Sequence, residues 1–176
     1  VRLVGDCVAF VVAETAEQAR DAAELIVVDY DPLTAVTGTA QAAEPSAPSV
    51  WDDCPDNMCF YLERGDRQAV DAAIAGADHV VQKRLLINRI TAVAMEPRGC
   101  LGEYDARHQR YTLHTGLQRP HEIRQRVARQ IFHIPETDVH VLPGDVGGSF
   151  GMRGSIYNEL LLVLWAARKT GRPVKW

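Results

Sequence analysis

The chain has 176 residues, a length that suits one domain or two small ones and allows a hydrophobic core to be buried. Its formal net charge is only −4, so the composition excludes strong electrostatic attraction to nucleic acid or to a membrane surface. No apolar run is long enough to cross a bilayer.

Both ends of the sequence suggest a piece of a longer polypeptide. The chain starts at Val1, lacks the pattern of a signal peptide, and ends in a segment typical of a strand that is beginning. The four cysteines form only one close pair, Cys54 and Cys59, with no second pair to complete a zinc site. We therefore expect free thiols in a reducing cytoplasm and no metal-ligating cluster.

The first 35 residues show a strand, helix, strand pattern. Residues 7–13 are almost wholly apolar and predict a buried strand. Thr15 followed by Gln18 fits a capping box, which predicts a helix over 16–25. Residues 26–30 predict a second strand, which Asp31 and Pro32 end.

A segment rich in Ala, Thr, Pro and Ser follows and is typical of a linker. We place the domain boundary there, with one domain over 1–35, a linker over 36–52 and a second domain over 53–176. Within the second domain, residues 57–63 and 79–90 predict strands. Between them, Asp66 and Gly76 are suited to begin and end a helix over 67–75.

The remaining elements complete an α+β fold, with mixed strands packed against two to three helices. We expect a hairpin of strands over 101–105 and 110–115, a helix over 122–132, a strand over 139–142, a helix over 155–170 and a strand from 174. The helix over 155–170 is apolar around most of its circumference and should be buried. Gly171 is suited to end it.

Glu96 and Arg98 stand two residues apart in an apolar, proline-containing segment. One interpretation is an ion pair that holds a turn together, and the other is a catalytic carboxylate. A general base needs a shifted pKa and access to substrate, and neither can be inferred from the sequence. We therefore favour the structural pair.

Residues 144–154 hold five glycines in eleven positions, between a predicted strand and a predicted helix. Glycines allow positive φ and a close approach of a ligand to the backbone, and amide groups at a helix start favour anionic oxygens. The loop is neither a Gly-x-Gly-x-x-Gly fingerprint nor a Walker A loop. A cradle for a phosphate or other oxygen-rich group and a tight loop without a ligand are both consistent with this spacing.

Three short strings stand out in the second half of the chain: Gly-Gly-Ser-Phe-Gly at residues 147–151, Met-Glu-Pro-Arg-Gly at 95–99 and Leu-Gln-Arg-Pro-His at 117–121. These strings resemble segments of the large subunits of the molybdenum hydroxylases, the family of xanthine dehydrogenase, aldehyde oxidase and carbon monoxide dehydrogenase. The first is similar to the family's Gly-Gly-x-Phe-Gly loop. Residues 4–33 are similar to the end of the family's α/β hammerhead domain.

The resemblance implies that the first domain is an incomplete hammerhead and the second the start of a molybdopterin-binding domain. It assigns to Gln118 a hydrogen bond to an oxo ligand of the molybdenum centre, although Leu117 stands where the family usually has Thr. The loop residues next to the cofactor would be Gly147, Gly148, Ser149, Phe150 and Gly151, with Ser149 where a third glycine is common.

By the same resemblance, the parent protein hydroxylates an electron-poor carbon with water as the oxygen source. The implied cofactor is molybdenum–molybdopterin, in its cytosine dinucleotide form. An iron–sulfur small subunit and an FAD medium subunit would be the partners, in a homodimer of heterotrimers. The family's general-base glutamate lies outside this chain, so we expect the 176 residues alone to have no turnover.

Gly154 occupies the place of a substrate-binding glutamate in xanthine-specific members. We therefore expect an aldehyde or an aromatic N-heterocycle as substrate. Carbon monoxide oxidation depends on a cysteine loop expected beyond Trp176, so it stays open. Two further hypotheses are a cofactor-free scaffold for subunit docking and an unrelated phosphate-binding enzyme, and the missing Lys-Ser/Thr argues against the latter.

Overall fold

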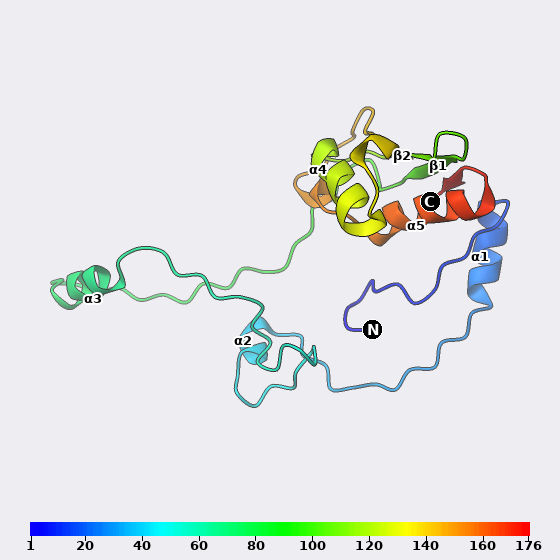
Figure 1. Cartoon of the computed structure of the whole chain (residues 1–176). Helices are drawn as coiled ribbons and strands as arrows, with labels where there is room; N and C mark the ends of the chain where they lie inside the picture. Colours follow the sequence, from blue (N-terminus) through cyan, green and yellow to red (C-terminus); the bar gives the residue numbers. More distant parts are fainter. The chain divides into compact units, whose positions relative to one another are not determined.

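The computed structural model describes all 176 residues, and it divides into two compact units. One unit consists of Val1–Asp6 and Val28–Asn88, and the other of Cys7–Val27 and Arg89–Trp176. Figure 1 traces the chain from blue to red through both units. The second unit contains the sheet and the core, and it positions the candidate site.

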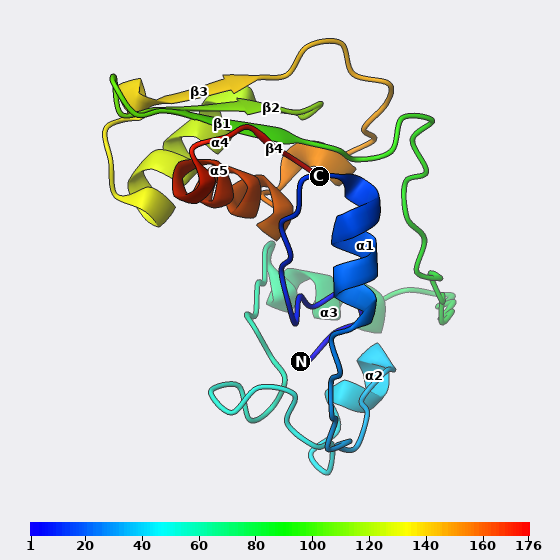
Figure 2. The same ribbon diagram turned by 90° about the vertical axis from the view of Figure 1, so that its right-hand side faces the viewer.

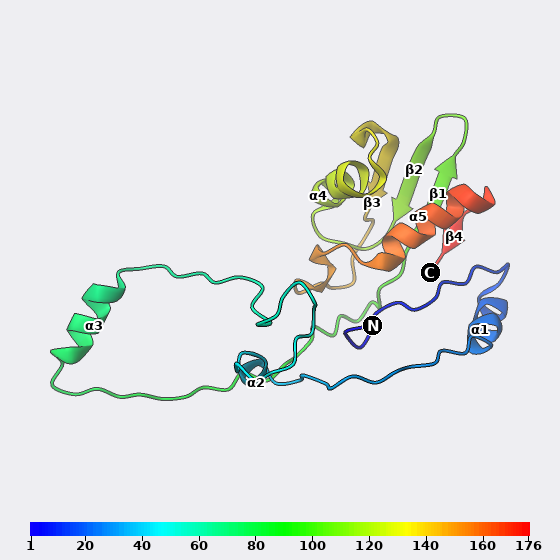
Figure 3. The same cartoon turned by 60° about the horizontal axis from the view of Figure 1, so that its bottom comes forward.

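The sheet of the second unit has four short strands in the order β3-β2-β1-β4. They are β1 (Leu101–Asp105), β2 (Arg110–His114), β3 (Val139–Leu142) and β4 (Val174–Lys175). Strand β1 pairs antiparallel with β2 and β4, while β2 pairs parallel with β3. The β1–β2 hairpin confirms the sequence prediction and is visible edge to edge in Figure 3.

The hairpin turn is stabilised by a single aspartate. The Asp105 carboxylate accepts hydrogen bonds from the amides of Arg107 and His108, at 2.9 and 3.2 Å, and lies 2.6 Å from His108 Nδ1. These contacts hold the pKa of Asp105 below its usual range, with His108 as the largest cause. Gln109, at φ +53°, completes the turn.

Helices α4 (Pro120–Gln125) and α5 (Asn158–Thr170) cover one face of this sheet (Figure 2). The core between the two layers is mainly aliphatic, and its largest fully buried side chains are Leu113, Ile123, Val127, Val139, Val163 and Leu164. Gly102 of β1 lets α5 come close, because a Cβ there would lie 2.6 Å from the carbonyl carbon of Val163. The predicted buried helix is thus confirmed along its inner side, whereas Trp165 is half exposed.

Two helix boundaries differ from the sequence predictions. The helix expected over 122–132 starts as α4 and continues as a π-helical segment, η1 (Arg126–Phe132), which His133 ends in the left-handed conformation. The helix expected from residue 155 begins at Asn158, after a 3₁₀ turn, η3 (Met152–Gly154). The helix start therefore does not point directly out of the glycine loop. A further 3₁₀ turn, η2 (Glu136–Asp138), precedes β3.

Three helices lie in the first half of the sequence: α1 (Ala16–Glu24), α2 (Thr39–Ala42) and α3 (Arg67–Ala75). The Thr15–Gln18 capping box begins α1, and the Asp66 carboxylate caps α3 by accepting from the Ala69 amide at 2.9 Å. Both caps confirm the sequence predictions. Helix α2 lies in the segment predicted as a linker. No helix in the chain combines the length and the apolar character needed to cross a membrane.

The strand predictions for residues 7–13, 26–30, 57–63 and 79–90 are wrong for this structure. None of these segments forms a strand ladder. A helix satisfies its backbone groups within one segment, but a strand needs a neighbouring strand to accept and donate its hydrogen bonds. An apolar run therefore indicates strand character without supplying the partner.

Candidate functional site

The glycine loop follows β3 and leads into η3, as the sequence predicts. Its backbone enters the left-handed region at four positions: Gly144, Gly148 and Gly151 have φ of +60°, +108° and +93°, and Phe150 has φ of +51°. Successive amides in such a chain can point into one concavity and favour anionic oxygens. Gly151 has open space where a Cβ would stand, and the Phe150 side chain is 80% exposed.

Four consecutive amides of the loop have no acceptor within the protein. The N–H groups of Gly148, Ser149, Phe150 and Gly151 donate to no backbone or side-chain oxygen. Backbone donors need partners, which must here be water or a ligand. The loop therefore offers a row of free donors, the property expected of a cradle for an oxygen-rich group.

Gln118 lies against the end of this loop. Its backbone amide donates to the Arg153 carbonyl at 3.0 Å. Its side-chain Oε1 stands 3.5 Å from where a Cβ would be built on Gly154. The Gln118 side chain is exposed and makes no hydrogen bond of its own. The side-chain amide group of Gln118 is thus free to donate to a neighbouring acceptor.

Not every predicted loop residue offers a free donor. The Gly147 amide donates to Glu96 Oε2 at 2.7 Å, and the Gly147 carbonyl accepts from the Glu96 amide at 3.2 Å. Ser149 Oγ accepts from the Arg153 amide at 3.1 Å. Gly147 is therefore joined to the 94–96 segment, while Gly148 to Gly151 keep their amides unpaired.

The Glu96–Arg98 pair favoured from the sequence is wrong, because each residue has another partner. Glu96 Oε2 lies 2.7 Å from Arg153 Nη1, and Arg98 Nη2 lies 3.7 Å from Glu159 Oε1. The Gly147 amide, followed by Arg153, holds the pKa of Glu96 below its usual range. Residues 57 positions apart in the sequence form this pair, so no local spacing could have revealed it.

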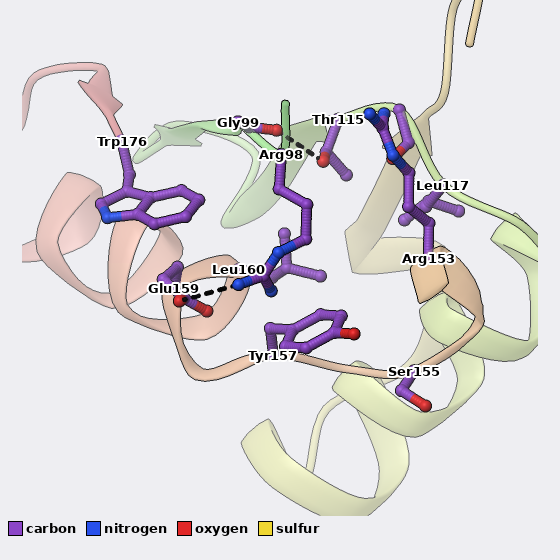
Figure 4. A pocket seen from close by; sticks show the side chains of 11 residues that line it. Arg98, Gly99, Thr115, Leu117, Arg153, Ser155, Tyr157, Glu159, Leu160 and Trp176 are labelled. Atoms are coloured by element: carbon purple, nitrogen blue, oxygen red, sulfur yellow. Dashed lines mark hydrogen bonds and ion pairs between the residues drawn. The ribbon is translucent and has the colours of Figure 1, made fainter. Parts of the chain in front are cut away.

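A recess lies beside Arg153 and the Arg98–Glu159 pair. It holds about 310 Å³ of space that is not filled by atoms, and part of this space is open to solvent. Figure 4 shows Arg98 between Glu159 and the Tyr157 ring, with Trp176 and Arg153 on opposite sides. The Arg98 guanidinium carbon is 3.7 Å from the centre of the Tyr157 ring, a cation–π contact. Thr115 and Gly99 also line the recess, and Thr115 Oγ1 donates to the Gly99 carbonyl at 2.7 Å.

The arginines of the α4–η1 region make local ion pairs. Arg124 and Arg129 both reach Glu136, at 3.1 and 2.7 Å, and Arg126 reaches Glu122 at 4.0 Å. The sequence is consistent with either a solvated face or partner contacts for these side chains. The pairs to Glu136 connect the helix to η2 and so help to place β3, which precedes the glycine loop.

Comparison with known proteins identifies two domain types along the chain. Residues 50–176 match the molybdopterin cofactor-binding domain, and residues 1–34 match the a/b hammerhead domain of aldehyde oxidase and xanthine dehydrogenase. The finer division into 1–35, 36–52 and 53–176 stays a prediction.

Whole-chain relatives point the same way. The chain is 34% identical over 181 residues to the carbon monoxide dehydrogenase large chain of Afipia carboxidovorans, covering 96% of this chain and 22% of the relative. It is 31% identical over 176 residues to the nicotine 6-hydroxylase large subunit of Paenarthrobacter nicotinovorans, covering 100% of this chain and 21% of the relative. The chain thus spans about a fifth of the length of these relatives.

Solved structures give the same result. A Cu,Mo-CO dehydrogenase in its carbon monoxide reduced state superposes with a TM-score of 0.85 at 32% identity, covering 92% of this chain and 22% of that one. Quinoline 2-oxidoreductase from Pseudomonas putida 86 superposes with a TM-score of 0.75 at 33% identity, covering 93% and 20%. The chain therefore belongs to the molybdenum hydroxylase large-subunit family, and it carries sequence of both the hammerhead and the molybdopterin cofactor-binding domains.

Proposed function

We propose that this chain is the part of a molybdenum-dependent oxidoreductase large subunit that holds one side of the molybdopterin cofactor. The whole protein would oxidise an aldehyde or an aromatic N-heterocycle, with water as the oxygen source. The observation that carries the proposal is the row of unpaired amides from Gly148 to Gly151, next to the free side chain of Gln118.

These residues fit an oxygen-rich, anionic group. Gly151 leaves space at its Cβ position, and the loop amides are donors without acceptors in the protein. Gln118 adds a neutral amide donor that would orient such a group without competing as a metal ligand. When bound, the cofactor would supply the redox chemistry and a strong oxygen nucleophile near neutral pH.

The chain's own residues would bind and orient. The Gly148–Gly151 amides would donate to the group, and Gln118 would donate from beside the end of the loop. No residue of the chain is proposed as general base, since Glu96 Oε2 already accepts from the Gly147 amide and from Arg153, and these contacts lower the pKa of Glu96 and so weaken it as a proton acceptor. We expect the 176 residues alone to have no turnover.

The substrate class is inferred from Gly154 and from relatives that act on N-heterocycles. Gly154 brings no carboxylate to the loop end, which disfavours purine recognition by a glutamate at that place. The similarity to nicotine 6-hydroxylase and quinoline 2-oxidoreductase supports an N-heterocycle. The partners would be an iron–sulfur small subunit and an FAD medium subunit in a homodimer of heterotrimers, with the cytosine dinucleotide form of the cofactor.

A second candidate is carbon monoxide oxidation. The identity of 34% to a carbon monoxide dehydrogenase large chain and the TM-score of 0.85 to a Cu,Mo-CO dehydrogenase favour it. The two candidate functions predict different substrates for the whole protein. Dye reduction driven by carbon monoxide would replace the first candidate, and dye reduction driven by quinoline, nicotine or an aldehyde would support it.

The test is a measurement of molybdenum by elemental mass spectrometry on the full-length large subunit, co-expressed with its partner subunits. We expect about one molybdenum per large subunit together with a released pterin nucleotide. A protein without molybdenum, under conditions that load a related hydroxylase, would contradict the proposal and favour a cofactor-free docking role.

A further inference from the structure

The buried guanidinium of Arg153 joins three separate segments of the chain. Its side chain is only 3% exposed, and its Nη1 donates to Glu96 Oε2 at 2.7 Å and to the Gly116 carbonyl at 3.3 Å. Its Nη2 donates to the carbonyls of Glu96 and of Pro97, the latter at 3.3 Å. Burying a charge is unfavourable unless it is paired and hydrogen-bonded, so a contact set of this size indicates a defined structural task.

The backbone of Arg153 also connects the two groups of predicted cofactor residues. Its amide donates to Ser149 Oγ inside the loop, and its carbonyl accepts from the Gln118 amide. Glu96 holds the other end of the loop through the Gly147 amide and carbonyl. The Glu96–Arg153 pair therefore touches both ends of the loop and the segment that carries Gln118.

Two glycines make room for this arrangement. A Cβ on Gly116 would lie 2.5 Å from Arg153 Nη1, and a Cβ on Gly147 would lie 2.5 Å from the Glu96 Cβ. These positions are filled by the ion pair rather than left open for a ligand. The lack of a side chain at Gly116 and Gly147 therefore leaves room for the Glu96–Arg153 pair. The amides that follow Gly147 are left free for a ligand.

We propose that Glu96 and Arg153 are positioning residues, which hold the Gly148–Gly151 amides and Gln118 in one fixed arrangement toward the cofactor. The proposal rests on the proposed function for its ligand, and on the hydrogen bonds of the chain itself for its geometry. The proposed arrangement does not involve the recess beside Arg153.

The experiment uses the full-length large subunit with its partners and the variant Glu96→Gln. The variant keeps the shape of the side chain but removes the charge that faces Arg153. Hydrogen exchange by mass spectrometry should show faster exchange of the Gly147 and Gln118 amides by about tenfold. Activity per bound molybdenum should fall by about tenfold through kcat, with KM little changed.

Glu159→Gln is the matched control. It removes the charge of the neighbouring pair, Arg98–Glu159, which has no hydrogen bond to the glycine loop. We expect wild-type exchange in residues 144–154 and wild-type activity per molybdenum. Equal effects of Glu96→Gln and Glu159→Gln would show a general loss of packing and would overturn the proposal.

Gly116→Ala provides a second route if Glu96→Gln does not fold. Its Cβ would displace the Arg153 guanidinium without changing any charge, and it should raise the same exchange rates. The exchange measurement needs no bound molybdenum, so it separates the two proposals. Unchanged exchange in the loop of either variant overturns the positioning pair, whereas a wild-type protein without molybdenum contradicts the proposed function alone.

Discussion

Residues 1–99 and residues 100–176 contain similar apolar runs but bury them differently. Every buried side chain lies between Cys100 and Ala167, and none lies in the first 99 residues. In 79–90, for example, Leu86 and Ile87 are 81% and 94% exposed, whereas Leu113 of β2 is fully buried. The difference shows that apolar sequence becomes a core only where a strand partner and a covering helix are both present.

The comparison is sharpest for a core truncation with a matched exposed one. Leu113→Ala should destabilise the second unit by about 2–5 kcal/mol, because it removes contacts and leaves a cavity between β2 and α5. Leu86→Ala should change stability by less than about 0.5 kcal/mol. Urea unfolding followed by tryptophan fluorescence measures both, and equal losses would contradict the contrast between the two stretches.

Thiol reactivity offers a chemical test of the same contrast. Burial, followed by the nearby Glu159 charge, raises the pKa of Cys100 to about 11. Compared with a thiol at its ordinary pKa of 9.0, the Cys100 thiolate should be about a hundredfold scarcer near pH 8. Iodoacetamide should therefore modify the exposed Cys7 and Cys59 well before Cys100, as mass spectrometry of peptides would show.

The raised pKa also sets the direction of a pH effect. Folding favours the neutral Cys100 thiol, so its contribution to stability is present below about pH 9 and is lost as pH rises toward 11. Cys100→Ala should make the unfolding midpoint less sensitive to pH in that window. A wild-type midpoint that rises with pH there would have the opposite sign.

A smaller effect is expected where the sheet meets α5. Gly102→Ala places a Cβ 2.6 Å from the Val163 carbonyl carbon, so backbone must move, and about 1–3 kcal/mol of stability should be lost. Gly38→Ala is the control in the other stretch, because its Cβ would meet only Gln41 atoms, at 3.5 Å or more. Equal shifts of the denaturation midpoint in both variants would show that the close approach of α5 to Gly102 does not determine the stability.

The smallest effect concerns α3, a helix that is stabilised by local contacts alone. Asp66→Ala removes the cap on the Ala69 amide and should cost α3 about 1 kcal/mol. Because α3 buries no residue, the loss should appear as faster hydrogen exchange within Arg67–Ala75 and not as a lower unfolding midpoint of the sheet unit. A lowered midpoint would show that α3 supports the core.

Local sequence signals therefore predicted some parts of the site better than others. The strand, glycine loop, helix order around residue 144 is confirmed, because turns and helix caps depend on neighbours within a few residues. The roles of Gln118 and of Gly147 to Gly151 toward a cofactor stay predictions. What the sequence missed is the partner of Glu96, since Arg153 is brought to it by the packing of β3 and the loop.

By itself, the sequence determined the family, the α+β class, the caps of α1 and α3, and the position of the glycine loop. Each depends on residues that are adjacent or a few positions apart, or on motifs that keep their spacing. Only the tertiary structure decided which apolar runs became strands, which loop amides stayed free, and which arginine neutralises Glu96. Those outcomes depend on contacts between distant segments, whose geometry is set when the sheet and helices pack together.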